Sequence, residues 1–91
     1  MPEPIHEYVL TPHAEREIAR RGIGEATLLA VLEAPEQRLS VRAGRDVLQS
    51  RMMIGTRTHL IRVFVDVDRI PAEVVTAYRT SRIGKYWRTE S

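Results

Sequence analysis

The sequence predicts an α+β fold, with two N-terminal helices packed on one face of a four-stranded antiparallel sheet and a short first strand before them. Three observations lead to this prediction. The first third of the chain holds two segments with helix start and stop signals. From residue 38 onward, alternating apolar segments are separated by turn residues. Helices followed by a run of strands are typical of α+β domains, and 91 residues make one domain, residues 1–91.

The N-terminal elements have clear boundaries. Residues Tyr8–Leu10 form the short strand. Thr11 is a good N-cap and Pro12 suits the first helical position, so a helix runs from Pro12 to about Arg21 and stops at Gly22. A second helix, rich in leucine and valine, covers Glu25–Leu32 and ends before Pro35.

Four strands follow, each bounded by a turn. We expect them at Arg38–Arg42, Asp46–Ile54, His59–Val67 and Glu73–Thr80. In the third of these strands, Ile61, Val63, Val65 and Val67 alternate with Leu60, Arg62, Phe64 and Asp66. The all-aliphatic set should meet the helices, because alternate residues point to opposite faces of a sheet. The face with Arg62 and Asp66 is then at least partly open, and it offers a groove for an extended ligand.

Charge is distributed unevenly along the chain. Residues 1–36 carry seven glutamates against three arginines, a net charge of −4, whereas residues 37–91 carry eleven basic against five acidic residues, a net charge of +6. A basic C-terminal half suits a polyanionic partner such as RNA, although a solvated arginine-rich surface gives the same pattern.

Several classes of function find no support. There is no cysteine, and His6, His13 and His59 lack metal-ligand spacing, so we expect no metal site and no cofactor. Gly22 and Gly24 lack the pattern of a phosphate-binding loop. No apolar run suggests a secretion signal or a membrane span, and we expect a cytoplasmic protein that does not contact membranes.

The first helix carries a polar stripe. His13, Arg16 and Arg20 lie within about 60 degrees of one another around its axis. The positive end of the helix disfavours a second proton on His13, and a neutral imidazole can act as a general base. The alternative is that Arg16 and Arg20 pair with neighbouring glutamates on the surface.

The last strand and the tail hold a second cluster. Tyr78, Arg79 and Thr80 end the strand, and alternation places Tyr78 and Thr80 on one side and Arg79 on the other unless a bulge intervenes. Arg82, Lys85 and Tyr86 follow, together with Trp87, which could anchor the tail. Arginine and lysine bind phosphate, and aromatic rings stack on bases.

At both ends the chain resembles a small bacterial domain family. The segments YVLTPHA, RRGI and LEAPE resemble its opening, and VVTAYRTSRIGKYW resembles its last strand and tail. The family is similar in layout to the RelE/ParE and BrnT toxins and to the wider group of barnase, EndoU and colicin-type ribonucleases. The resemblance implies a metal-independent endoribonuclease that an antitoxin could hold inactive.

The function expected from the sequence is therefore RNA cleavage by attack of the 2′-hydroxyl. His13 would act as base or acid, Arg16 and Arg79 would stabilise the phosphate, and Tyr78 or Thr80 would orient it. The nucleic-acid-binding residues would be Arg20, Arg82, Lys85 and Tyr86. The alternative is a non-catalytic module of the same fold that binds RNA or protein.

Overall fold

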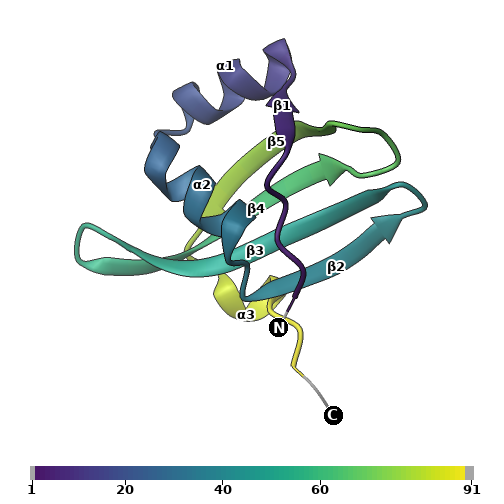
Figure 1. Ribbon diagram of the computed structural model, residues 1–91. Coiled ribbons are helices and arrows are strands. Elements are labelled where there is room, and N and C mark those ends of the chain that lie inside the picture. The colour runs from purple at the N-terminus through teal and green to yellow at the C-terminus, as the bar shows by residue number, and fades with distance from the viewer. Residues whose placement is uncertain (1, 90–91) are drawn as a thin grey trace.

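The computed structural model describes residues 2–89 and confirms the α+β class. Strand β1 (Tyr8–Leu10) leads into helices α1 (Pro12–Arg20) and α2 (Glu25–Glu33), and a short helix α3 (Ile83–Tyr86) lies near the C-terminus. Between them run the four longer strands β2 (Gln37–Arg42), β3 (Arg45–Ile54), β4 (Arg57–Asp66) and β5 (Ala72–Thr80) (Figure 1). The predicted elements are therefore present, with boundaries shifted by one or two residues.

The five strands form one sheet in the order β1-β5-β4-β3-β2. Strands β2 to β5 pair antiparallel with their sequence neighbours, whereas β1 pairs parallel to β5, with Tyr8 opposite Ala72 and Leu10 opposite Val74. The backbone N–H of Thr11 donates to the Val74 carbonyl at 3.1 Å. This bond fixes the start of α1 beside β5.

One hairpin turn depends on a glycine. Gly44 has φ +82°, and a β-carbon at this position would lie 2.8 Å from Oδ2 of Asp68. At this position of the turn between β2 and β3, the backbone conformation favours glycine, and a side chain would require Asp68 to move. The carbonyl of Gly44 accepts a hydrogen bond from the N–H of Val67 at 2.9 Å, which ties this turn to the end of β4.

The hydrophobic core lies between the two long helices and one side of the sheet, which we call the helix face. Ile61, Val63 and Val65 are fully buried there, and Val67 packs at the edge, so the aliphatic face predicted for this strand is confirmed. From the helices, the core takes Ala14, Ile18, Leu28, Val31 and Leu32. Burying one such aliphatic side chain stabilises the fold by roughly 1.5–3 kcal/mol.

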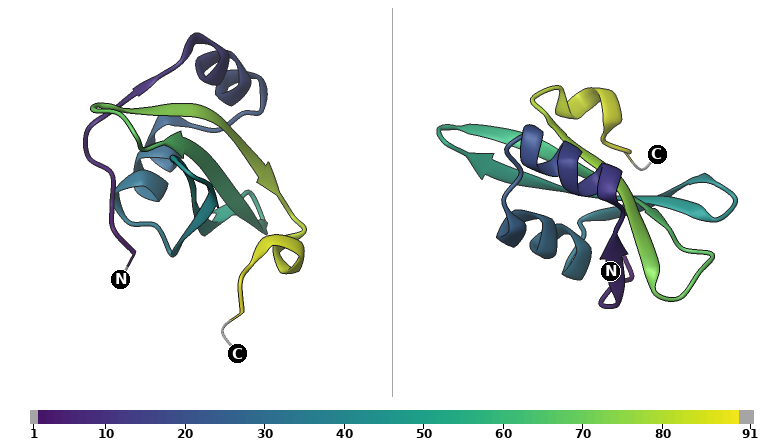
Figure 2. Two further views of the ribbon diagram at one scale, coloured as in Figure 1. Left: turned by 90° about the vertical axis from the view of Figure 1, so that its right-hand side faces the viewer. Right: turned by 90° about the horizontal axis from the view of Figure 1, so that it is seen from above.

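The opposite side of the sheet carries Leu60, Arg62, Phe64 and Asp66 from β4, and we call it the α3 face. Figure 2 shows α3 on the side of the sheet away from α2. Arg62 and Phe64 are half-buried, whereas Leu60 is fully buried. The polar residues predicted for a partly open face are therefore assembled beside the tail. Among the helices of residues 2–89, none has the length and apolarity needed to cross a membrane.

Candidate nucleic-acid interface

The α3 face is organised around the guanidinium of Arg62. Its Nε donates to Oε1 of Gln49 at 2.8 Å, and its Nη1 donates to the hydroxyl of Tyr78 at 2.7 Å. The sheet register places both partners directly beside Arg62, Gln49 on β3 and Tyr78 on β5. Three adjacent strands therefore hold one cation in a fixed orientation.

Aromatic rings surround this cation. Its Cζ lies 4.4 Å from the ring centroid of Tyr86, 5.3 Å from that of Phe64 and 5.7 Å from that of Tyr78. The rings also contact one another, since Phe64 stacks on Tyr78 at 5.9 Å and Tyr86 meets Tyr78 edge-on at 6.0 Å. Such cation–π contacts stabilise a guanidinium by about 0.5–2 kcal/mol, depending on its exposure.

A chain of side-chain amides links this centre to the tail. Gln49 is fully buried, and its Nε2 donates to Oε1 of Gln37 at 2.7 Å and to the carbonyl of Tyr86 at 3.3 Å. The Gln37 amide in turn donates to the carbonyl of Arg88 at 2.7 Å and accepts from its N–H at 3.1 Å. Helix α3 and the segment after it are thus held on the sheet by two side-chain amides, each of which both donates and accepts hydrogen bonds.

Arg62 has no carboxylate partner within residues 2–89, in contrast to several other arginines. Arg45 pairs with Asp66 at 2.6 Å, and Arg51 pairs with Glu36 at 2.9 Å. Of the five guanidinium N–H groups of Arg62, two donate to the acceptors given above, and three have no acceptor in that part of the chain. A half-buried cation without a counter-charge favours an incoming anion, because the anion restores the lost electrostatic stabilisation.

The pKa values of the two tyrosines beside Arg62 are shifted in opposite directions. Burial raises the pKa of Tyr78 above its ordinary value of 10.0. The adjacent Tyr78 hydroxyl lowers the pKa of Tyr86, and the nearby charges of Lys85 and Arg62 lower it further. The ammonium of Lys85 lies 5.3 Å from the Tyr86 ring centroid. Tyr86 is therefore the more acidic phenol of the pair and the one placed next to both cations.

The structure brings together part of the site expected from the sequence. Tyr78, Tyr86 and Lys85 meet around Arg62. Thr80 lies on the same side of β5 as Tyr78, and its hydroxyl accepts from the backbone N–H of Arg82 at 3.0 Å. The exposed Arg82 therefore begins the turn that leads into α3.

The remaining predicted residues lie on the other side of the sheet. A β-carbon on Gly22 would lie 3.8 Å from Nη2 of Arg79, so Arg79 sits beyond the C-terminal end of α1. His13 is exposed in the first turn of α1, a helix of nine residues and about 13 Å, and Arg16 is exposed at its middle. The expected cluster of His13 with Arg79 is therefore not formed, because His13 lies at the start of α1 whereas Arg79, on β5, lies beyond the other end of that helix. The separation of Tyr78 from Arg79 by strand alternation is as predicted.

Arg20 pairs with a neighbouring glutamate, which was the alternative to a role in RNA binding. It forms a two-point contact with the carboxylate of Glu17, at 2.9 Å and 3.0 Å. The same carboxylate pairs with Arg21, whose Nη1 donates to the carbonyl of Ala77 at 2.8 Å. This network ties the end of α1 to β5, so Arg20 takes part in a structural contact and not in the assembly around Arg62.

Arg62, Gln49 and Gln37 were missed as site residues. The available signal was a single arginine between leucine and phenylalanine in an otherwise apolar strand. Its importance depends on the strand register, which places Gln49 and Tyr78 beside it, and sequence alone does not fix that register.

Arg62, Tyr78 and Tyr86 line none of the three clefts described within residues 2–89. One of these clefts borders the tail, where Gln37 and Arg88 line it, and the most apolar of them lies between α1, α2 and β1. Comparison of the chain with protein-family models, with curated proteins and with solved structures found no match.

Proposed function

We propose that the α3 face binds single-stranded RNA, with one backbone phosphate seated at the guanidinium of Arg62. The observation that carries this proposal is the half-buried Arg62, which is oriented by Gln49 and Tyr78 and lacks a carboxylate partner within residues 2–89. A planar guanidinium with free N–H groups matches two phosphate oxygens at once.

The surroundings of Arg62 suit an extended polynucleotide. Tyr86 and Trp87 are half-buried aromatic residues at the edge of the face, and base–aromatic stacking stabilises single strands by about 1–3 kcal/mol per base. Exposed cations follow along the tail, namely Arg82, Lys85 and Arg88. The net charge of +6 on residues 37–91 favours the approach of a polyanion.

Binding of a labelled, mixed-sequence RNA, measured by fluorescence anisotropy, tests the proposal. We expect Arg62→Gln to weaken binding at least tenfold. We also expect it to lower the slope of log affinity against log salt by about 0.7, the value for one lost phosphate contact on a single strand. The RNA affinity of Arg62→Lys should lie between those of Arg62→Gln and the natural protein, because lysine keeps the charge but not the planar guanidinium.

Arg79→Gln is the matched control, since it removes the same charge from an exposed residue on the helix face. We expect its affinity to stay within about threefold of the natural protein. Lys85→Gln, in the exposed turn, gives a second variant on the α3 face should Arg62→Gln fail to fold. Equal losses in Arg62→Gln and Arg79→Gln would show that net charge, not the Arg62 centre, governs binding.

A second candidate function is cleavage of the bound RNA without a metal ion, and the lowered pKa of Tyr86 favours it. In this reaction the phenolate of Tyr86 would take the proton of the 2′-hydroxyl. The 2′-oxygen would form a bond to phosphorus while the bond from phosphorus to the 5′-oxygen breaks. Arg62 would stabilise the pentacoordinate phosphate, and Lys85 would give a proton to the leaving oxygen. The products are a cyclic phosphate and a 5′-hydroxyl.

Product analysis of the same RNA, incubated in EDTA, separates the two candidates. An enzyme would give cleavage that increases with pH as Tyr86 ionises and that falls at least tenfold in Tyr86→Phe. Binding without products would leave the protein as an RNA-binding module. The residue tested as the base is Tyr86 and not His13, because α1 lies on the other side of the sheet.

We further infer a toxin-type domain with the RelE/ParE layout, in which both N-terminal helices cover one sheet face and leave the other for RNA. An antitoxin protein that masks the α3 face would be its second partner, and both would act in the cytoplasm. The supporting observations are the helix-covered core on one face and the cation without a counter-charge on the other.

A further inference from the structure

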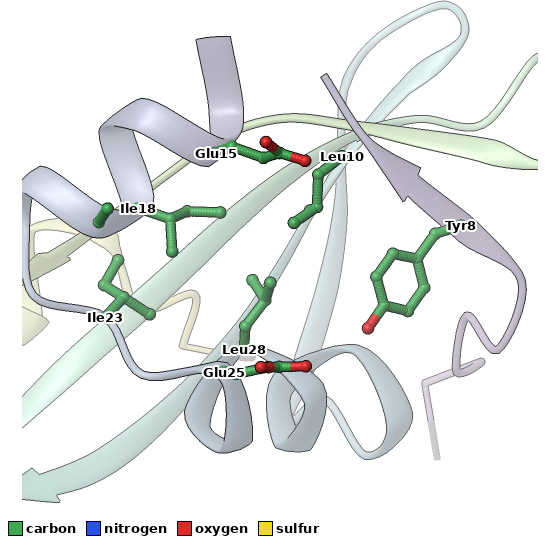
Figure 3. Close-up of a pocket in the computed structure, with 8 residues that line it drawn as sticks. Tyr8, Leu10, Glu15, Ile18, Ile23, Glu25 and Leu28 are labelled. Atoms are coloured by element: carbon green, nitrogen blue, oxygen red, sulfur yellow. The ribbon is translucent and has the colours of Figure 1, made fainter. Parts of the chain in front are cut away.

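An apolar cleft that the RNA proposal does not use lies between α1, α2 and β1. It has a volume of about 440 Å³, which falls within the usual range for small-molecule sites. Its floor is made of aliphatic side chains from all three elements, and Figure 3 shows Leu10, Ile18 and Leu28 pointing into it. Ile18 and Leu28 also belong to the hydrophobic core, so the floor is rigidly held.

Two glutamates stand on opposite rims of this cleft. Figure 3 shows Glu15, from the first turn of α1, on one side and Glu25, from the first turn of α2, on the other. Both are exposed, and none of the ion pairs found within residues 2–89 uses either of them.

A tyrosine hydroxyl completes the Glu25 side. Tyr8 lines the cleft from β1, and its hydroxyl points toward Glu25 (Figure 3). Burial, followed by the nearby carboxylates of Glu33 and Glu25, raises the pKa of Tyr8, so its hydroxyl stays protonated. Its oxygen lone pairs can accept a hydrogen bond from a cation held by Glu25.

We propose that this cleft binds a linear aliphatic diamine, with one ammonium group at Glu15, the other at Glu25 and Tyr8, and the methylene chain on the aliphatic floor. The chemistry of the three parts determines the ligand class. An apolar floor alone would take any aliphatic molecule, and two carboxylates alone would take any cation. Carboxylates on opposite rims of an apolar floor favour a molecule with positive charge at both ends and methylenes between them.

The site is independent of the RNA proposal, because its lining residues come from the N-terminal half and from the helix side of the molecule. The local charge agrees with this assignment, since residues 1–36 have a net charge of −4. The chain therefore presents an anion-binding face and a cation-binding cleft on different sides.

Titration of the labelled protein with cadaverine, followed by NMR of the backbone amides, tests the proposal. We expect saturable shifts confined to residues 8–28 and an affinity at least fivefold higher than for pentylamine, which has one charge. The corresponding pentanediol, which has none, should not bind measurably. This comparison needs no variant, so it does not depend on the folding of any substituted protein.

Charge-neutral substitutions locate the site. We expect Glu15→Gln and Glu25→Gln each to weaken cadaverine binding about threefold to fivefold, and the double variant to weaken it at least tenfold. The double variant Glu3→Gln with Glu7→Gln makes the same change in net charge at a separate cleft near Pro71 and should bind as the natural protein does. Equal affinity for cadaverine and pentylamine, or equal losses in the two double variants, would overturn the proposal.

Discussion

At the scale of single residues, Arg62 is a cation whose partial burial is offset by aromatic rings and neutral acceptors instead of a carboxylate. Replacing a buried charge leaves its acceptors unsatisfied, which costs about 1–3 kcal/mol for each group. Through the hydroxyl of Tyr78 and the amide of Gln49, Arg62 therefore has a structural role besides the binding role proposed for it. For that reason its role in binding must be judged against a variant that keeps the charge.

The same cluster makes a prediction about the three tyrosines. Tyr86 should ionise below the ordinary pKa of 10.0, whereas Tyr8 and Tyr78 should ionise above it. Because the pKa of Tyr86 is lowered by folding, its contribution to stability grows as the pH rises through its folded pKa and is complete above 10.0. Ultraviolet difference absorption against pH resolves the three steps.

Two variants assign these steps. Tyr86→Phe should remove the earliest step, and Tyr78→Phe should move that step to higher pH, because the adjacent Tyr78 hydroxyl is the largest cause of the lowered pKa of Tyr86. Tyr8→Phe is the control and should leave the earliest step unchanged. Simultaneous ionisation of all three tyrosines near or above 10.0 would contradict the lowered pKa of Tyr86.

At the scale of elements, the sequence predicted the features that depend on neighbouring residues, such as the start of α1. The Thr11 hydroxyl accepts from the N–H of Ala14 at 3.1 Å and Pro12 begins α1, as its residue types predict. The parallel pairing of β1 with β5 could not be predicted, because it joins residues more than 60 positions apart and a three-residue strand carries no register signal. The predicted site was limited in the same way. Placing His13 and Arg79 in one cluster required the position of α1 relative to β5, which depends on that pairing.

The cap of α1 makes a stability prediction. Thr11→Ala should lower the free energy of unfolding by about 1 kcal/mol, because the N–H of Ala14 loses its side-chain acceptor. Thr11→Ser retains the hydroxyl and should cost at most a few tenths of a kcal/mol. Urea unfolding, followed by circular dichroism, gives both values, and equal losses in the two variants would show that the methyl group matters more than the cap.

At the scale of the whole molecule, the sheet separates two kinds of chemistry. One side is covered by α1 and α2 and holds the core, and an apolar cleft with Glu15 and Glu25 at its rims opens beside these helices. The other side carries Arg62, the tyrosines and the basic tail. Composition predicted the division of charge between the two halves of the chain, whereas the fold turns that division into two distinct surfaces.

The central claim is that RNA contacts the α3 face through Arg62. The most direct test is NMR of the labelled arginine side chains and amides during titration with a short single-stranded RNA. We predict shifts of the Arg62 Nε–H, of Tyr78 and of residues 82–88, with His13, Arg16 and Arg79 unchanged. Shifts confined to His13, Arg16 and Arg79, with the Arg62 signal unmoved, would contradict the claim and place RNA on the helix face.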